Sequence, residues 1–307
     1  MARYGLPYMG SKNKIAEWVL SYLPQADNFY DLFCGGCAIT HCAVTQRKYK
    51  NYFINDIKKE MPQAFIDCIN GKYNNDYRWI SHEDFDKLKG KGDLLVDICF
   101  SFGNNWRKGY AYSREIEPYK KALHYAIFFN DYSLAKEMYG IDFSFIKSIV
   151  VVAQKYAIVK KSIKDNNITK CIQLETLERL QNLERLHRMY DLQNLERLQF
   201  SITPSSLSYN ELEIKPNSVI YCDIPYRSTA KYNDIEFDYD KFYEWCLEQT
   251  EPLFISEYDM PKGDFVCVGA KSKVIGICAT DKSSKAIEKI FVPKHQVFYK
   301  PLTLFDL

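Results

Sequence analysis

The apolar positions of the first sixty residues predict two short strands joined by a glycine turn and a helix. The first strand covers residues 27–33, the turn is Cys34-Gly35-Gly36-Cys37, the helix covers 38–45, and the second strand covers 52–56. In this geometry, backbone N–H groups approach a nucleotide-like cofactor. The second strand ends in Asp56, twenty residues after Gly36, at a spacing that suits a carboxylate on ribose hydroxyls. Taken alone, Asp56 could equally cap a loop.

Upstream of the first strand, the segment from Tyr8 to Lys12 is predicted to open a helix with Ser11 as its N-cap. An apolar stripe follows with helical spacing and ends before Pro24. A lysine at a helix start is not favoured by the helix dipole. Lys12 therefore indicates an anionic partner, such as the carboxylate of a cofactor.

A further apolar run, residues 217–222, is bounded by prolines and predicts a central strand of an α/β sheet. The turn Asp223-Ile224-Pro225-Tyr226 follows it. Its carboxylate, fixed carbonyls and aromatic ring suit a planar base with an exocyclic amine, on which the ring would stack. These four residues alone would also fit an ordinary strand-to-loop turn.

Beyond this turn the pattern predicts four more elements. They are a polar, Tyr-rich loop over 227–240, a helix from 242 to 247, a strand over 253–256 and a hairpin over 264–292.

The turn at 223–226 resembles the Asp-Pro-Pro-Tyr signature of amino-methyltransferases that act on DNA. Ile224 replaces the first proline of that signature, but the family uses the backbone carbonyl of this place, which remains. The segments Tyr8-x-Gly10-x-Lys12, Asp31 to Gly36 and Asn55-Asp56 extend the likeness. Together they resemble the alpha class of Dam-like adenine-N6 DNA methyltransferases, in which the cofactor half comes first, a recognition region is inserted, and the catalytic turn follows.

This resemblance implies a Rossmann-like α/β methyltransferase sheet built from residues 1–58 and 197–307, with a mostly helical target-recognition region inserted at 59–196. It implies S-adenosylmethionine as cofactor and double-stranded DNA as partner. The residues expected at the cofactor are Tyr8, Gly10, Lys12, Asp31, Phe33, Gly35, Gly36, Asp56 and Asp223. The expected catalytic residues are Asp223, Ile224, Pro225 and Tyr226. The reaction would be direct methyl transfer to the N6 amine of an adenine flipped out of a specific duplex sequence.

Two other functions fit the same residues. One is a cytosine-N4 methyltransferase of the same fold, although Asp rather than Ser at the first place of the turn favours adenine. The other is a catalytically impaired DNA-binding relative, which the retention of Asp223, Tyr226, Lys12 and Asp56 argues against. The pair Pro-Cys, the nucleophile motif of cytosine-C5 methyltransferases, is absent from the sequence, which disfavours covalent catalysis.

The inserted region contains a loop from Phe100 to Tyr110 that is rich in Gly, Asn, aromatic and basic residues. Asn can read an adenine edge, and Arg or Lys can read guanine or hold phosphate. The candidates for DNA contact are Asn104, Asn105, Trp106, Arg107 and Lys108. Net charge is only +2, but residues 101–165 hold eleven Lys and Arg against six Asp and Glu, a modest basic footprint. A surface loop and a solvated charged face would explain both features as well.

Residues 174–199 form a Leu-rich hexapeptide repeat in which an apolar residue recurs every third position. The composition favours helix, but a period of three drifts around a helix of 3.6 residues per turn. We therefore expect that the helix breaks or that its apolar stripe spirals. The repeat is predicted to be a structural spacer between the recognition region and the catalytic half.

The remaining features describe the setting of the protein. No apolar stretch approaches the roughly 18 residues that span a bilayer, so a cytoplasmic protein is expected. The family resemblance implies a bacterial or phage origin and a restriction endonuclease as a further partner. Ten cysteines are expected to be small buried residues, and no metal is expected at Cys34-x-x-Cys37. Residues 301–305 faintly resemble a peptide that binds a sliding clamp, and a packed final strand is the alternative.

Overall fold

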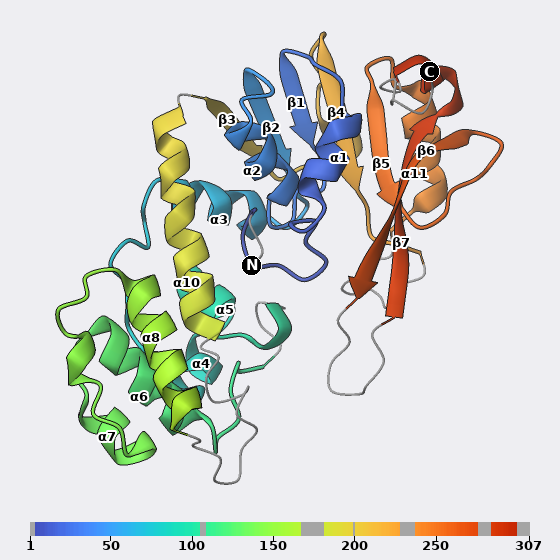
Figure 1. Cartoon of the computed structure of the whole chain (residues 1–307). Coiled ribbons are helices and arrows are strands. Elements are labelled where there is room, and N and C mark those ends of the chain that lie inside the picture. The colour runs from blue at the N-terminus through green and yellow to red at the C-terminus, as the bar shows by residue number, and fades with distance from the viewer. Residues whose placement is uncertain are drawn as a thin grey trace. The chain divides into compact units, whose positions relative to one another are not determined.

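The computed structural model describes residues 4–104, 109–166, 181–198, 200–227, 237–275 and 284–299. It contains two compact units (Figure 1). The first combines Met1–Leu6, Gly10–Asn70 and Asn194–Leu307, and the second combines Pro7–Met9 and Gly71–Gln193. The first unit is therefore discontinuous in sequence. It extends through Asn70, whereas the sequence pattern placed the first boundary at residue 58.

The first unit is built on a sheet of seven described strands in the order β3-β2-β1-β4-β5-β7-β6. Their bounds are β1 Asn28–Asp31, β2 Asn51–Asn55, β3 Ser201–Ser205, β4 Ser218–Asp223, β5 Leu253–Glu257, β6 Phe265–Ile275 and β7 Ser284–Pro293. The first five strands in this order run parallel, and β7 is antiparallel to both β5 and β6. The α/β fold, the central strand at 217–222 and the C-terminal hairpin are thus confirmed.

Helices cover both faces of this sheet. Their bounds are α1 Ala16–Tyr22, α2 Ala38–Thr45, α3 Glu60–Ile69 and α11 Tyr239–Glu248, with short 3-10 turns η4 Tyr209–Glu211 and η5 Lys294–Tyr299. Alternate strand residues point to opposite faces. Tyr30 and Ile220 pack with Phe242 of α11 in one core cluster. On the other face, Thr40 of α2 bonds to Asp31.

The predicted helix start at Ser11 is wrong. Helix α1 begins at Ala16, with Ile15 as an N-cap that forms no side-chain hydrogen bond. The Ser11 hydroxyl instead accepts a 3.4 Å hydrogen bond from the backbone N–H of Asn13. Lys12 therefore lies in a turn region four residues before the helix. Its charge interacts with residues distant in the sequence rather than with a helix dipole.

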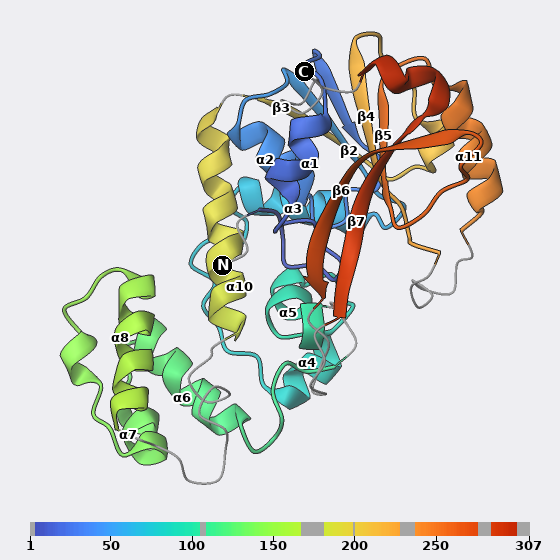
Figure 2. The ribbon, with the colours of Figure 1, turned by 45° about the vertical axis from the view of Figure 1, so that its right-hand side comes forward.

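The second unit is helical, as expected for the inserted region (Figure 2). Its elements are α4 His82–Leu88, α5 Leu94–Cys99, η1 Phe102–Asn104, α6 Glu117–Phe128, α7 Ser133–Tyr139, η2 Ser144–Ile146, α8 Val152–Asp165 and α10 Gln181–Asp191. One apolar cluster joins Leu123 of α6, Phe143, Val159 of α8 and Leu183 of α10. Across both units, the described helices include none that is both long and apolar enough to cross a membrane.

The described part of the Leu-rich repeat changes helix type along its length, while residues 174–180 lie outside the described residues. Helix α10 gives way at Leu192 to the 3-10 helix η3 Leu192–Leu198. A 3-10 helix has three residues per turn, so apolar residues at every third position stay on one face there. The conflict between a period of three and a period of 3.6 is thus relieved by a change of geometry at residue 192.

Candidate active site

The carboxyl ends of the parallel strands bring the polar residues of the first unit to one edge of the sheet. Asp31 ends β1, Asp56 follows β2, Asp223 ends β4, and Glu257 ends β5. In an open α/β sheet, ligands bind beyond this edge. Four acids from segments far apart in the sequence are therefore placed where a ligand is expected.

The glycine turn after β1 is fixed from two sides. The carboxylate of Asp56 accepts hydrogen bonds from the backbone N–H of Gly35 at 2.9 Å and of Lys58 at 3.0 Å. On the other side, the N–H of Leu6 donates to the carbonyl of Gly36 at 2.7 Å. A Cβ atom at Gly5, which has a φ of +68°, would lie 2.3 Å from that carbonyl oxygen, so only glycine permits this approach.

Asp31 is a buried acid rather than a surface ligand in this arrangement. It is 2% exposed, and its Oδ2 atom accepts a 2.7 Å hydrogen bond from the hydroxyl of Thr40. Burial, assisted by the nearby charge of Asp223, raises the pKa of Asp31 to about 7, although the Thr40 bond opposes the shift. Burial likewise raises the pKa of Asp56, against the two backbone bonds that it accepts.

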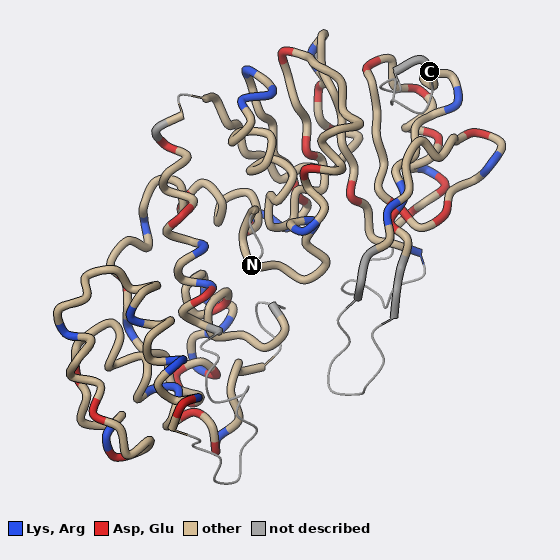
Figure 3. The backbone as a smooth tube through the Cα atoms, in the orientation of Figure 1, with Lys and Arg blue, Asp and Glu red and all other residues tan. Residues whose placement is uncertain are grey.

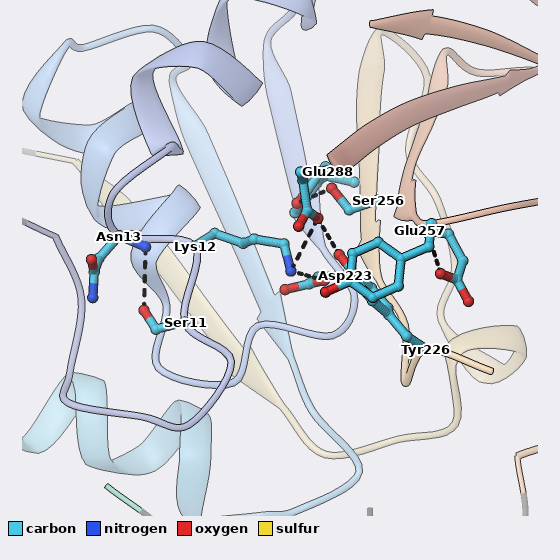
Figure 4. Close-up of polar contacts among 10 residues, drawn as sticks. Ser11, Lys12, Asn13, Asp223, Tyr226, Ser256, Glu257 and Glu288 are labelled. Carbon is cyan, nitrogen blue, oxygen red and sulfur yellow. Dashed lines mark hydrogen bonds and ion pairs between the residues drawn. The ribbon is translucent and has the colours of Figure 1, made fainter. Parts of the chain in front are cut away.

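The turn at 223–226 carries an ion pair with Lys12 (Figure 4). The Lys12 Nζ atom lies 2.6 Å from Asp223 Oδ1 and 3.4 Å from Glu288 Oε1. Burial would lower the pKa of Lys12, but the charges of Asp223 and Glu288 outweigh it and raise the pKa above its usual value. Lys12 is therefore a buried, charged ammonium shared by two carboxylates. The expectation of an anionic partner is met within the chain itself.

Tyr226 is enclosed by the same group of residues. Its hydroxyl donates a short hydrogen bond to Glu288, and the Lys12 ammonium lies 4.7 Å from the centre of its ring. The ring of Tyr258 meets it edge-on at 4.5 Å. Tyr226 is only 9% exposed. The ammonium of Lys12 therefore contacts two catalytic candidates, Asp223 and Tyr226.

The other residues predicted at the site lie as follows. The Ile224 side chain is buried in the core cluster that contains Tyr30 and Phe242, so this position has a packing role. The carbonyl of Pro225 accepts a 2.8 Å bond from Tyr239. Phe33 packs against the rings of Tyr209 and Phe242. Gly10 has a φ of +81°. Tyr8 is half-buried and belongs to the segment Pro7–Met9, which clusters with the second unit.

Glu288 and Glu257 were not singled out from the sequence. Glu288 lies on β7 and is fully buried. Glu257 is also buried and accepts the backbone N–H groups of Arg227 and Tyr258. The available signal was that Glu288 shares the face of its strand with Ile290 and Val292, because an acid on an apolar face is unusual.

The cysteines near the glycine turn act as packing residues. Cys34, Cys37 and Cys42 are buried and free of disulfides, which agrees with the expectation for most cysteines of the chain. Within the described ranges, no group of three or more His, Cys, Asp or Glu side chains is arranged to hold a metal ion.

The candidate DNA loop is described at its base. Residues 105–108 lie outside the described residues, and Asn104 is described only by its backbone, at the end of η1. The base is closed by a bridge between Ser101 and Tyr110 and by a 2.8 Å bond from Phe102 N–H to the Gly109 carbonyl. Arg185 of the repeat donates to the carbonyls of Cys99 and Ser101. The repeat therefore supports the loop base, a role beyond that of a spacer.

Lys and Arg residues recur along the helices of the second unit (Figure 3). On α8, Lys161 and Lys164 are exposed, whereas Lys155 is buried against the carbonyl of Ile127 and the amide of Asn130. Part of the local positive charge is thus internal, and part of it faces solvent.

Comparison with known proteins agrees with this geometry. A family model described as "D12 class N6 adenine-specific DNA methyltransferase" matches residues 8–245. The match includes the glycine turn, Asp56, the whole inserted region and the turn at 223–226. It ends before the hairpin that carries Glu288. No curated protein matches the chain.

Proposed function

The chain belongs to the D12 class N6 adenine-specific DNA methyltransferase family, and on this premise we propose how its residues carry out methyl transfer. The enzyme methylates the N6 amine of adenine in DNA with S-adenosylmethionine as methyl donor. The roles of individual residues are our proposal. It is carried chiefly by one observation. Asp223 ends β4, the strand that pairs with β1 and so lies beside the glycine turn, and its carboxylate contacts the buried ammonium of Lys12.

The residues around the glycine turn fit the cofactor. Asp56 is held by Gly35 and Lys58, yet each carboxylate oxygen can accept a further bond, which suits the ribose hydroxyls. When bound, S-adenosylmethionine supplies an electrophilic methyl group on a positively charged sulfur. The Asp223 carboxylate at this edge suits a cationic ligand, whereas Asp31 lies buried against Thr40. Phe33, Gly10, Gly35 and Gly36 would shape the pocket, and contact of Tyr8 with the cofactor stays a prediction.

The catalytic turn would orient the adenine. The carboxylate of Asp223 accepts one hydrogen bond from the amine, and the carbonyl of Ile224 accepts the second. These bonds direct the nitrogen lone pair toward the methyl group and hold it in line. Pro225 fixes the turn, and Tyr226 offers its ring to the base. The amine loses its proton only after it has gained positive charge, so no strongly basic group is needed.

The second unit would select the DNA sequence. Supporting this, the two ends of the segment that contains Asn104, Asn105, Trp106, Arg107 and Lys108 are joined by a backbone bridge between Ser101 and Tyr110, and Arg185 bonds to the carbonyl of Cys99 beside it. The target adenine would be flipped out of the duplex to reach Asp223. A cytoplasmic, restriction-linked setting and a clamp contact through residues 301–305 remain predictions; that segment lies outside the described residues.

The proposal is tested with purified protein, S-adenosylmethionine and unmethylated duplex DNA, followed by analysis of the methylated nucleosides. We expect N6-methyladenine at one short recurring sequence. N4-methylcytosine as the product would overturn the assignment of the turn to adenine, and methylation without sequence preference would remove the recognition role of the second unit.

A further inference from the structure

A single group, Lys12, covers both parts of the turn that would receive the adenine. Its ammonium is 2.6 Å from the Asp223 carboxylate and lies over the Tyr226 ring at 4.7 Å. An adenine that takes both the Asp223 oxygen Oδ1 and the Tyr226 ring face under Lys12 displaces this ammonium. Because a buried charge is costly without a partner, it must move to another anion.

Glu288 has the geometry of that second anion. It is fully buried, and its Oε1 atom is already 3.4 Å from the Lys12 Nζ atom. Its Oε1 atom also accepts the Tyr226 hydroxyl. The Oε2 atom is buried and has no hydrogen-bond partner among the described residues. A buried carboxylate oxygen without a donor is rare in native proteins, and this one lies on the carboxylate that Lys12 already touches.

We propose that Glu288 is a positioning residue that takes the Lys12 ammonium from Asp223 when the target adenine enters, and so frees both the Asp223 carboxylate and the Tyr226 ring. This inference rests on the proposed roles of Asp223 and Tyr226. It gives the β6–β7 hairpin, which lies beyond the family match, a part in the reaction. It also explains why an acid is buried on the face of β7 that carries Ile290 and Val292.

The first test compares Glu288→Gln with the wild type in steady-state methylation. Gln keeps the size of the side chain but removes its charge, so Lys12 remains on Asp223. We expect kcat to fall by at least about ten-fold, with KM for S-adenosylmethionine changed by less than about two-fold. Glu244→Gln, on an exposed position of α11, is the matched control and should keep the wild-type kcat. A wild-type kcat for Glu288→Gln would overturn the inference.

The second test asks whether Glu288 acts through Lys12. In a Lys12→Met background there is no ammonium to relocate, so adding Glu288→Gln should change kcat by less than about two-fold. If Glu288 merely supports the fold, it would lower kcat by the same factor in both backgrounds, which would contradict the inference. Should Lys12→Met be inactive, Tyr226→Phe decides: we expect a smaller loss than for Glu288→Gln, whereas equal losses would mean that Glu288 only anchors Tyr226.

Two further measurements separate the possible failures. Thermal unfolding and cofactor binding report whether Glu288→Gln folds. If it does not fold, Glu288→Asp takes its place, because Asp keeps the charge on a shorter side chain. Glu288→Asp should lower kcat without raising KM for S-adenosylmethionine, and a wild-type kcat would overturn the inference. Asp223→Asn is measured alongside. If Asp223→Asn is inactive and Glu288→Gln has wild-type activity, only the role of Glu288 is contradicted. If Asp223→Asn is active, the proposed function of the turn is contradicted.

Discussion

The ammonium of Lys12 lies 2.6 Å from the carboxylate of Asp223, although 211 positions separate the two residues in the sequence. The pair joins the segment before α1 to the end of the central strand β4. The ammonium that Asp223 and Glu288 share thus lies on the residue assigned to the target amine. The reactivity of the turn therefore depends on where this ammonium sits.

Asp56→Asn should weaken binding of S-adenosylmethionine. The substitution removes the charge that would accept the ribose hydroxyls, a loss worth about 1.5–3 kcal/mol for hydrogen bonds to a charged group. Calorimetric titration measures the change. Asp27→Asn is the matched control, because Asp27 lies at the opposite, amino end of the same strand layer and pairs with exposed Lys50. Equal affinities for both variants would remove Asp56 from the cofactor site.

Asp31 should make the protein less stable as the pH rises. Its pKa of about 7 in the folded state is above the ordinary value of 3.8, so the folded state holds this proton more tightly than the unfolded state. The stabilisation is present below about pH 4 and is lost as the pH rises through 7.

The size of this effect can be read from Asp31→Asn, which does not titrate. Relative to that variant, the wild type should lose up to about 4 kcal/mol of unfolding free energy between pH 4 and pH 8. Urea unfolding across this range measures the difference. The exposed Asp264→Asn serves as control and should follow the wild type at every pH. A pH-independent difference between wild type and Asp31→Asn would mean that folding does not raise the pKa of Asp31.

Substitutions in the candidate DNA loop should have different effects for Asn and Lys residues. Asn104→Ala or Asn105→Ala should relax the site preference at a cost of about 1–3 kcal/mol on the preferred sequence. Lys108→Ala should weaken binding to all sequences and flatten its salt dependence. Salt titrations and methylation profiles measure both effects, with exposed Lys91→Ala as control. Wild-type behaviour in all three variants would place recognition elsewhere in the second unit.

Arg185→Leu should destabilise the base of this loop. The carbonyls of Cys99 and Ser101 would lose a buried charged donor, at a cost of about 3 kcal/mol. Hydrogen exchange of the amides from 98 to 111 should rise more than that of the first unit. Arg78→Leu, which breaks only exposed ion pairs, should cost less than about 1 kcal/mol. If the two variants behave alike, Arg185 does not support the loop.

The sequence pattern correctly predicted the helices and strands whose ends are set by neighbouring residues. Helix α2 at 38–45 has its predicted bounds, and the strands at 217–222 and 253–256 lie within a residue of β4 and β5. The two strand runs are bounded by Pro216 and Pro252 before them and by Asp223 and Glu257 at their ends, and α2 follows the glycine turn. Such residues act on their immediate neighbours. The family resemblance rested on the same local segments.

Tertiary relationships could not be read in this way. A helix was expected to start at Ser11, but Lys12 forms an ion pair with Asp223 that no local pattern encodes. Glu288 was missed because both faces of β7 carry apolar residues, so the sequence does not say which face is buried. The repeat's switch to a 3-10 helix at Leu192 likewise depends on packing, since its composition favours an α-helix.

The central claim is that Asp223 orients the adenine amine, and it is tested most directly by single-turnover methylation with Asp223→Asn. We expect the rate of N6-methyladenine formation to fall by roughly 10²–10⁴-fold, because an amide oxygen lacks the charge that holds the amine. Thermal unfolding and DNA affinity should stay close to those of the wild type and of the exposed control Asp264→Asn. Formation of N6-methyladenine by Asp223→Asn at the wild-type rate would contradict the account.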